Sequence, residues 1–210
     1  MRADKQEEKP AEATIPREPI VWEPSSSGTI LFASNRNQLG KWDTSPKRFG
    51  SEPAEVVSGI SFFNIPMNSH KMGSLENFKL SELFVIPSDK FLAKDIKKNT
   101  LYESDDILLS VHGFNNGAER ASLAFMQIVY DIRFQGIPIA FLWPSLGESG
   151  ASAYHKDEET AALSYQPLAD FLVKLIEVNQ SKAKPGKIHL LAHSMGNRVL
   201  LNAVHLAKKK

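Results

Sequence analysis

Cysteine is absent from the 210 residues, which excludes disulfide bonds, cysteine-ligated zinc and a thiol nucleophile. A charge excess is also lacking, since 25 basic residues stand against 24 acidic ones and the formal net charge is +1. This balance predicts no strong attraction to nucleic acid or to an anionic membrane surface. No run of ~18 apolar residues is present, so no transmembrane segment is expected. Small molecules and other proteins remain as partners, and the oligomeric state stays open.

The N-terminal residues 1–27 lack the apolar core of a signal peptide, so a cytoplasmic location is expected by default. They combine mixed charge with three consecutive serines and four of the twelve prolines, too few apolar side chains to order themselves. The whole chain has 42% apolar and 23% charged residues, as an ordinary globular domain does. We therefore predict a flexible arm over 1–27 and one domain over 28–210.

In the first part of this domain, short apolar runs predict three strands, at residues 29–34, 58–67 and 82–86. The runs are separated by Gly, Pro, Asn and Ser. The polar Asn35-Arg36-Asn37 is expected to form a turn after the first strand. A short helix is expected over 90–98, because Phe91, Leu92 and Ile96 have helical spacing.

The second half alternates apolar runs of strand length with amphipathic segments of helical period. The strands are predicted at 106–112, 137–143 and 187–192, and the helices at 117–134, 157–178 and 195–206. Such alternation implies right-handed crossovers between parallel strands. The fold class is therefore α/β, with a mostly parallel sheet flanked by helices.

The middle helical segment contains residues that affect where helices begin and end. Asp157 is predicted as its N-cap, with Glu158 and Glu159 in the first turn, where the helix dipole favours negative charge. Catalysis by paired carboxylates is the weaker interpretation of this cluster. Pro167 lacks an amide donor, so the segment is predicted to break after Tyr165 into a short helix and a longer one.

The stretch Ala192-His193-Ser194-Met195-Gly196 joins the last strand to the last helix, as the nucleophile turn of a serine hydrolase does. That turn is tight and requires small residues on both sides of the serine. Gly196 meets the requirement, whereas Ala192 adds one methyl group where glycine is usual. Small-x-Ser-x-Gly strings are common by chance, so the prediction depends on the strand before and the helix after.

A second motif, Val111-His112-Gly113-Phe114-Asn115-Asn116-Gly117, also follows an apolar strand and precedes a helix. Parallel strands gather their functional residues at their carboxyl ends, so this loop is expected near Ser194. Gly113 allows a close approach of backbone to ligand. The amides of Phe114 and Met195 are predicted to form a two-donor oxyanion hole.

The order and spacing of TILFASNRN, ILLSVHGFNN, IAFLWPS and LLAHSMGNRVLL resemble the α/β-hydrolase superfamily, and more narrowly the bacterial family of unknown function DUF900. The resemblance covers about residue 28 to the end and is looser between 40 and 100. It implies an esterase- or lipase-like hydrolase with Ser194 as catalytic nucleophile and Phe114 and Met195 as oxyanion donors.

In the α/β-hydrolase fold that this sequence resembles, the acid and the histidine of the catalytic triad follow the serine, on loops after later strands. We therefore expect the chain to lack C-terminal strands, to be inactive as this fragment, and to associate through the unpaired edge of its last strand. His155, expected in a loop over 147–156, is the alternative base. The remaining histidines are expected to have structural roles: His70, His112, His189, His193 and His205.

The leading hypothesis is a serine hydrolase that cleaves a small-molecule ester or acyl substrate through an acyl-serine intermediate. The alternative is a catalytically dead domain that binds a ligand or a protein through the same cleft. No cofactor, nucleotide or metal site is predicted, because the sequence has neither a phosphate-binding glycine loop nor ligands at metal spacing.

Overall fold

The computed structural model describes residues 27–40, 44–65, 70–87, 90–99 and 101–210. Six strands form one sheet in the order β3-β2-β1-β5-β4-β6. The bounds are β1 Ser27–Gln38, β2 Phe49–Asn64, β3 Lys79–Ile86, β4 Ile107–Val111, β5 Ile137–Leu142 and β6 Ile188–Ala192. All but the last residue of the predicted N-terminal arm lie outside the described residues, and Ser27 itself begins β1.

The sheet is half antiparallel and half parallel. β1 to β3 form an antiparallel meander, whereas β1, β5, β4 and β6 run parallel to one another. The predicted α/β class is therefore confirmed. The predicted turn at Asn35-Arg36-Asn37 is wrong, because β1 continues to Gln38 through register shifts on both sides of Arg36.

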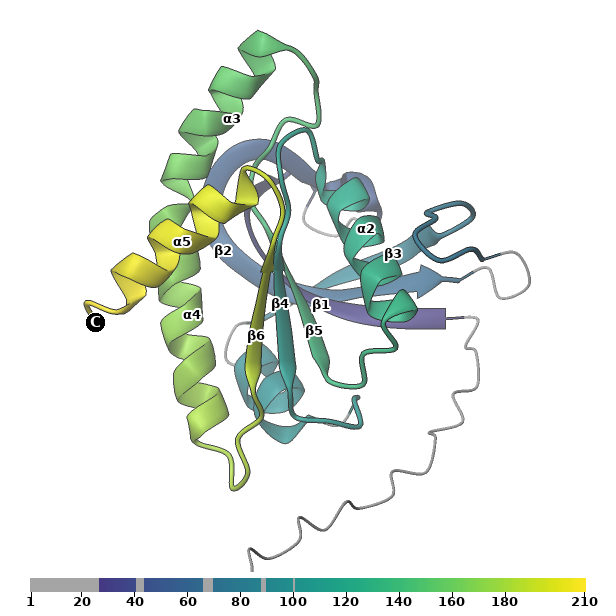
Figure 1. Cartoon of the computed structure of the whole chain (residues 1–210), viewed down its shortest axis with the longest axis vertical. Helices are drawn as coiled ribbons and strands as arrows, with labels where there is room; N and C mark the ends of the chain where they lie inside the picture. The colour runs from purple at the N-terminus through teal and green to yellow at the C-terminus, as the bar shows by residue number, and fades with distance from the viewer. Residues whose placement is uncertain (1–26, 41–43, 66–69, 88–89, 100) are drawn as a thin grey trace, which may run out of the picture.

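Helices cover both faces of the parallel half (Figure 1). α2 (Ala118–Asp131) packs against one face, and α4 (Tyr165–Gln180) and α5 (Gly196–Ala207) pack against the other. The remaining helical segments are η1 (Pro46–Arg48), α3 (Ala151–Leu163) and η2 (Phe91–Lys98). η2 is a π-helix where the sequence predicted a short helix over 90–98.

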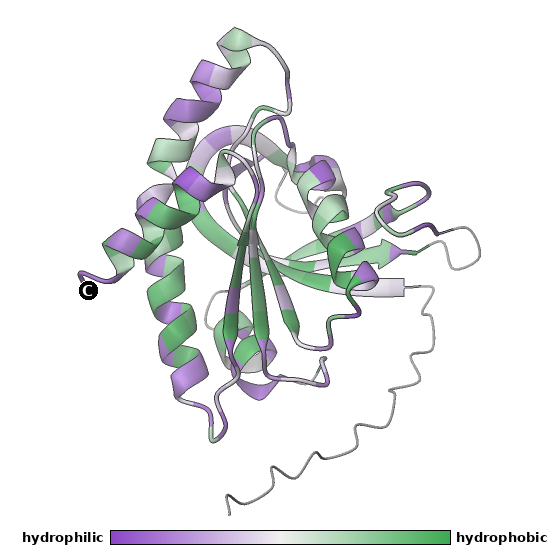
Figure 2. Cartoon of the chain, viewed as in Figure 1, coloured by the Kyte–Doolittle hydropathy of each residue, from purple (hydrophilic) through white to green (hydrophobic). Residues whose placement is uncertain are grey.

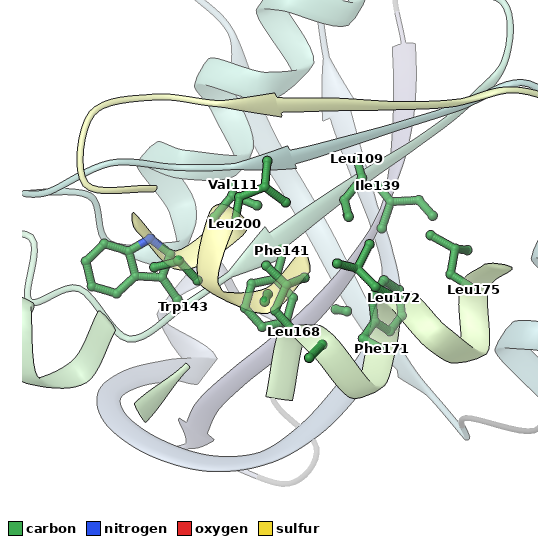
Figure 3. Close-up of a cluster of buried hydrophobic side chains, with 14 of the residues drawn as sticks. Leu109, Val111, Ile139, Phe141, Trp143, Leu168, Phe171, Leu172, Leu175 and Leu200 are labelled. Atoms are coloured by element: carbon green, nitrogen blue, oxygen red, sulfur yellow. The ribbon is translucent and has the colours of Figure 1, made fainter. Parts of the chain in front are cut away.

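The core consists of two layers, one on each face of the sheet, because successive strand side chains point to opposite faces. Figure 2 shows the apolar residues concentrated in the central strands and on the helix sides that face them. In Figure 3, strand side chains such as Leu109 and Phe141 point toward Leu168 and Phe171 of α4 and Leu200 of α5. Burial of each such side chain contributes roughly 1.5–3 kcal/mol to stability.

The helix predicted over 157–178 is two helices with different bounds. α3 already begins at Ala151, so the prediction that Asp157 caps a helix is wrong. Asp157 lies in the middle of α3 and is fully buried. The predicted break occurs at Ser164, and Pro167 occupies the first turn of α4, where an amide donor has no partner within the helix.

Candidate active site

Ser194 lies in the turn between β6 and α5, at the carboxyl end of the parallel strands. Its φ angle is +50°, a left-handed backbone conformation that is strained for a residue other than glycine. The turn is held by His193 N–H, which donates to Val111 O (3.2 Å), and by Gly196 N–H, which donates to His193 O (2.9 Å). Ser194 is solvent-exposed, so its hydroxyl is accessible to a ligand.

Two glycines allow this turn to lie against the end of β4. A Cβ on Gly196 would stand 2.4 Å from the carbonyl oxygens of Val111 and His112. A Cβ on Gly113 would stand 2.8 Å from His193 Nδ1 and 3.1 Å from Ser194 Cβ. The loop after β4 therefore contacts the Ser194 turn directly, as the sequence predicts for two motifs at neighbouring strand ends.

The amides of Phe114 and Met195, the predicted oxyanion donors, flank this contact. Among the described residues, neither N–H donates a hydrogen bond to any protein atom. Met195 occupies the N-cap position of α5, where the helix dipole is positive. Two unpartnered donors next to an exposed serine hydroxyl can stabilise a negative charge that develops on a bound carbonyl oxygen.

His112 is partly buried beneath this site and links the carboxyl ends of β4 and β5. Its ring lies parallel to the Trp143 ring at a centroid distance of 5.1 Å, and Trp143 Nε1 donates to His112 O (2.7 Å). Its two nitrogens face the carbonyl oxygens of Gly113 (3.0 Å) and Trp143 (3.1 Å). Burial, and secondarily the charge of Arg36, lower the pKa of His112 to about 3. His112 is therefore neutral near pH 7 and has a structural role, as predicted.

Asp157 is the buried carboxylate that joins the loops after β4 and β5. It accepts hydrogen bonds from Ser145 Oγ (2.5 Å) and Leu146 N–H (2.8 Å), and a longer one from Asn115 N–H (3.4 Å). This role was not predicted, because Asp157 was expected at a helix end. The signal that the helix begins earlier was available in Ala151 and Ala153, which have favourable helix propensity.

Arg36 is the second buried charge near the site, and it too was missed. Its guanidinium donates to Gly50 O (2.9 Å) and to Asn116 O (2.8 Å). Burial lowers the pKa of Arg36 to about 10, and the charge of Asp157 partly opposes this shift. Arg36 therefore remains a cation at neutral pH and ties β1 to the loop after β4.

His155, the alternative base, lies on α3 and not in the predicted loop over 147–156. Its side chain is 76% exposed, and its Nδ1 lies 3.3 Å from Glu158 Oε2. Glu158 also pairs with Arg198, in the first turn of α5, at 2.5 Å. These hydrogen bonds, chiefly the one from Arg198, lower the pKa of Glu158. Within the described ranges, no side chain is hydrogen-bonded to Ser194 Oγ.

The described residues contain no group of three or more His, Asp or Glu side chains arranged to hold a metal ion. Every helix in that part of the chain is too short or too polar for a membrane span. Comparison with curated proteins gives no match, and neither does comparison with solved structures. Residues 87–210 match the family described as "Alpha/beta hydrolase of unknown function (DUF900)". Because this match spans more than half of the chain, the protein belongs to the DUF900 α/β-hydrolase family.

Proposed function

We propose that the protein is a serine hydrolase that cleaves an ester-type bond in a small molecule. The observation that supports this proposal is the pair of amides, of Phe114 and Met195, that have no acceptor among the described residues and lie beside the exposed and strained Ser194. In this mechanism Ser194 Oγ attacks the acyl carbon, and both amides donate to the oxyanion. The alcohol then leaves with a proton, and water hydrolyses the acyl-serine intermediate.

The mechanism also needs a base that removes the proton from Ser194. Two described histidines have a carboxylate partner, His70 with Asp131 and His155 with Glu158, and an acid that orients a histidine is the arrangement found in catalytic triads. Asp131 is the last residue of α2, at the opposite end of that helix from the loop after β4, which leaves His155 as the candidate. Its bond to Glu158 is long, and Glu158 already pairs with Arg198. His155 is still the first residue to test as the base, because Arg198, which shares Glu158 with it, lies in the first turn of α5, directly after the Ser194 turn.

A second function is ligand binding at the same site without turnover. The observation that favours it is the absence, among the described residues, of a hydrogen-bonded base at Ser194 Oγ. In this case the two amides would hold the carbonyl or carboxylate oxygen of a bound molecule, and Ser194 would remain unmodified.

The decisive experiment is intact-mass analysis of the folded 210-residue chain after incubation with a fluorophosphonate. One adduct that is absent from Ser194→Ala would support the hydrolase, since only an activated serine beside oxyanion donors reacts rapidly. Loss of the adduct in His155→Gln as well, but not in the control His205→Gln, would identify the base. A folded chain that forms no adduct would contradict the hydrolase and favour ligand binding.

A further inference from the structure

The peptide group between Gly113 and Phe114 is held from its carbonyl side. Gly113 O lies 3.3 Å from Asn116 Nδ2 and 3.0 Å from His112 Nδ1. In a trans peptide the carbonyl and the N–H point in opposite directions. Contacts that fix the Gly113 carbonyl therefore also fix where the unpartnered Phe114 N–H points.

Asn116 is the side chain best placed to set this orientation. Its amide group donates to two successive carbonyls, of Gly113 (3.3 Å) and of Phe114 (2.9 Å). Asn115, which lies between Phe114 and Asn116 in the chain, has a φ angle of +59°. This is a left-handed conformation that asparagine tolerates better than most residues. The Asn116 side chain thus closes a tight turn in which both carbonyls point toward its NH2 group.

The backbone of Asn116 is anchored on both sides. Its N–H donates to Ser145 Oγ (3.1 Å), and its carbonyl accepts a hydrogen bond from Arg36 Nη2 (2.8 Å). Ser145 is buried and in turn donates to the buried Asp157. Because the backbone N–H and carbonyl of Asn116 are both fixed, its side chain loses little further conformational freedom when it binds the neighbouring peptide group.

We propose that Asn116 is a positioning residue that directs the Phe114 amide toward the acyl oxygen of the substrate. This inference rests on the proposed function, because it assigns the Phe114 N–H to the oxyanion of that reaction. Ser145, Asp157 and Arg36 fix the backbone of Asn116, and Asn116 in turn fixes the donor. The hydrogen bonds of Arg36, Ser145 and Asp157 behind the loop thereby contribute to transition-state stabilisation through Asn116.

The test compares Asn116→Asp with Asn202→Asp. The first variant keeps the side-chain shape but replaces an NH2 donor with a carboxylate oxygen facing two carbonyls. Asn202 donates its side-chain amide to Arg198 O on the exposed side of α5, so its variant has the same charge change away from the loop. Two quantities are measured: the residual dipolar coupling of the Phe114 N–H bond, and the second-order rate constant for fluorophosphonate labelling.

We expect Asn116→Asp to change the Phe114 coupling and to slow labelling about 100-fold, the effect of losing one oxyanion donor. Asn202→Asp should match the unsubstituted chain in both measurements. An unchanged Phe114 coupling, or labelling at the original rate, would overturn the proposal. If the unsubstituted chain is not labelled at all, the proposed function fails, while the dipolar coupling still decides whether Asn116 orients the amide.

Asn116→Ala provides a second variant that introduces no charge, for the case in which Asn116→Asp does not fold. With an activated ester as substrate, it should lower kcat by a similar factor and leave KM nearly unchanged, because the lost donor acts on the transition state. A variant that merely loosened the loop would raise KM or lower the melting temperature without this selective fall in kcat. That pattern would also overturn the proposal.

Discussion

At the scale of single residues, burial of titratable groups beneath the candidate site couples its stability to pH. The pKa of His112 is lowered from 6.5 to about 3, so between these values the unfolded chain binds a proton that the folded chain does not. Stability contributed by neutral His112 is therefore fully present above pH 6.5 and is lost as the pH falls. The slope from this one group approaches about 1.4 kcal/mol per pH unit.

We predict that the free energy of unfolding decreases between pH 6.5 and pH 5, before carboxylates with ordinary pKa values begin to bind protons. Urea denaturation at several pH values measures this slope. His112→Gln should lower the stability at pH 7 and flatten the slope, whereas His205→Gln, on the exposed side of α5, should leave the slope unchanged. An equal slope in all three proteins would show that His112 is not the group responsible.

The buried acceptor Asp157 gives a second prediction at this scale. Asp157→Asn keeps the side-chain volume but removes the charge and presents an NH2 group to donors from Ser145 and Leu146. Unpairing buried donors costs about 1–3 kcal/mol each, so the melting temperature should fall clearly. The control Asp170→Asn, on α4, changes a partly exposed carboxylate and should cost far less. Thermal unfolding measures both melting temperatures. A comparable fall in the two variants would argue against the role of Asp157.

At the scale of elements, the close approach of α5 to the end of β4 depends on Gly196. A Cβ there would meet two backbone carbonyls at 2.4 Å, and backbone cannot move aside as a flexible side chain can. We predict that Gly196→Ala destabilises the chain by about 1–3 kcal/mol, as overpacking does. Gly117→Ala, where no atom of a described residue lies within 4 Å of the added Cβ, is the matched control in a denaturation experiment. Equal stability of the two variants would show that the turn can relax around the extra methyl group.

The sequence predicted the elements that are strongly periodic or carry motifs. The three parallel strands, α2, α5 and the neighbouring positions of Ser194 and Gly113 follow from apolar runs and from glycine at the turns. Assignment of Ser194, Phe114 and Met195 to catalysis remains a prediction. Two polar residues were placed wrongly: buried Arg36 was predicted in a turn, and buried Asp157 at a helix N-cap. Only their tertiary partners, which come from distant segments, make burial of those charges possible.

At the scale of the whole molecule, β6 forms one side of the sheet, with β4 as its neighbour among the described strands. Leu190 in this strand is 45% exposed. Beside it lies a cavity of about 490 Å³ between β6, α4 and α5. The cavity is lined mainly by apolar side chains, among them Leu172, Val173, Ile176, Ile188, Leu190 and Val204.

An apolar edge strand invites pairing between molecules. We predict that the 210-residue chain associates as its concentration rises, measured by sedimentation velocity. Leu190→Lys should reduce the association by placing a charge on the edge. Leu163→Lys removes a comparably exposed leucine from α3 and should have little effect. A chain that stays monomeric at high concentration would contradict the prediction.

The pairing of β1 with β5 also sets the order in which the molecule can fold. Leu31 lies opposite Ile139, so the two strands meet across more than a hundred intervening residues. At ribosomal rates of about 5–20 residues per second, β5 is made roughly 5–20 s after β1. The β1–β2–β3 meander can form during that interval, but one side of β1 must wait without a partner. We therefore expect nascent chains of this protein to be most prone to aggregation before β5 leaves the ribosome.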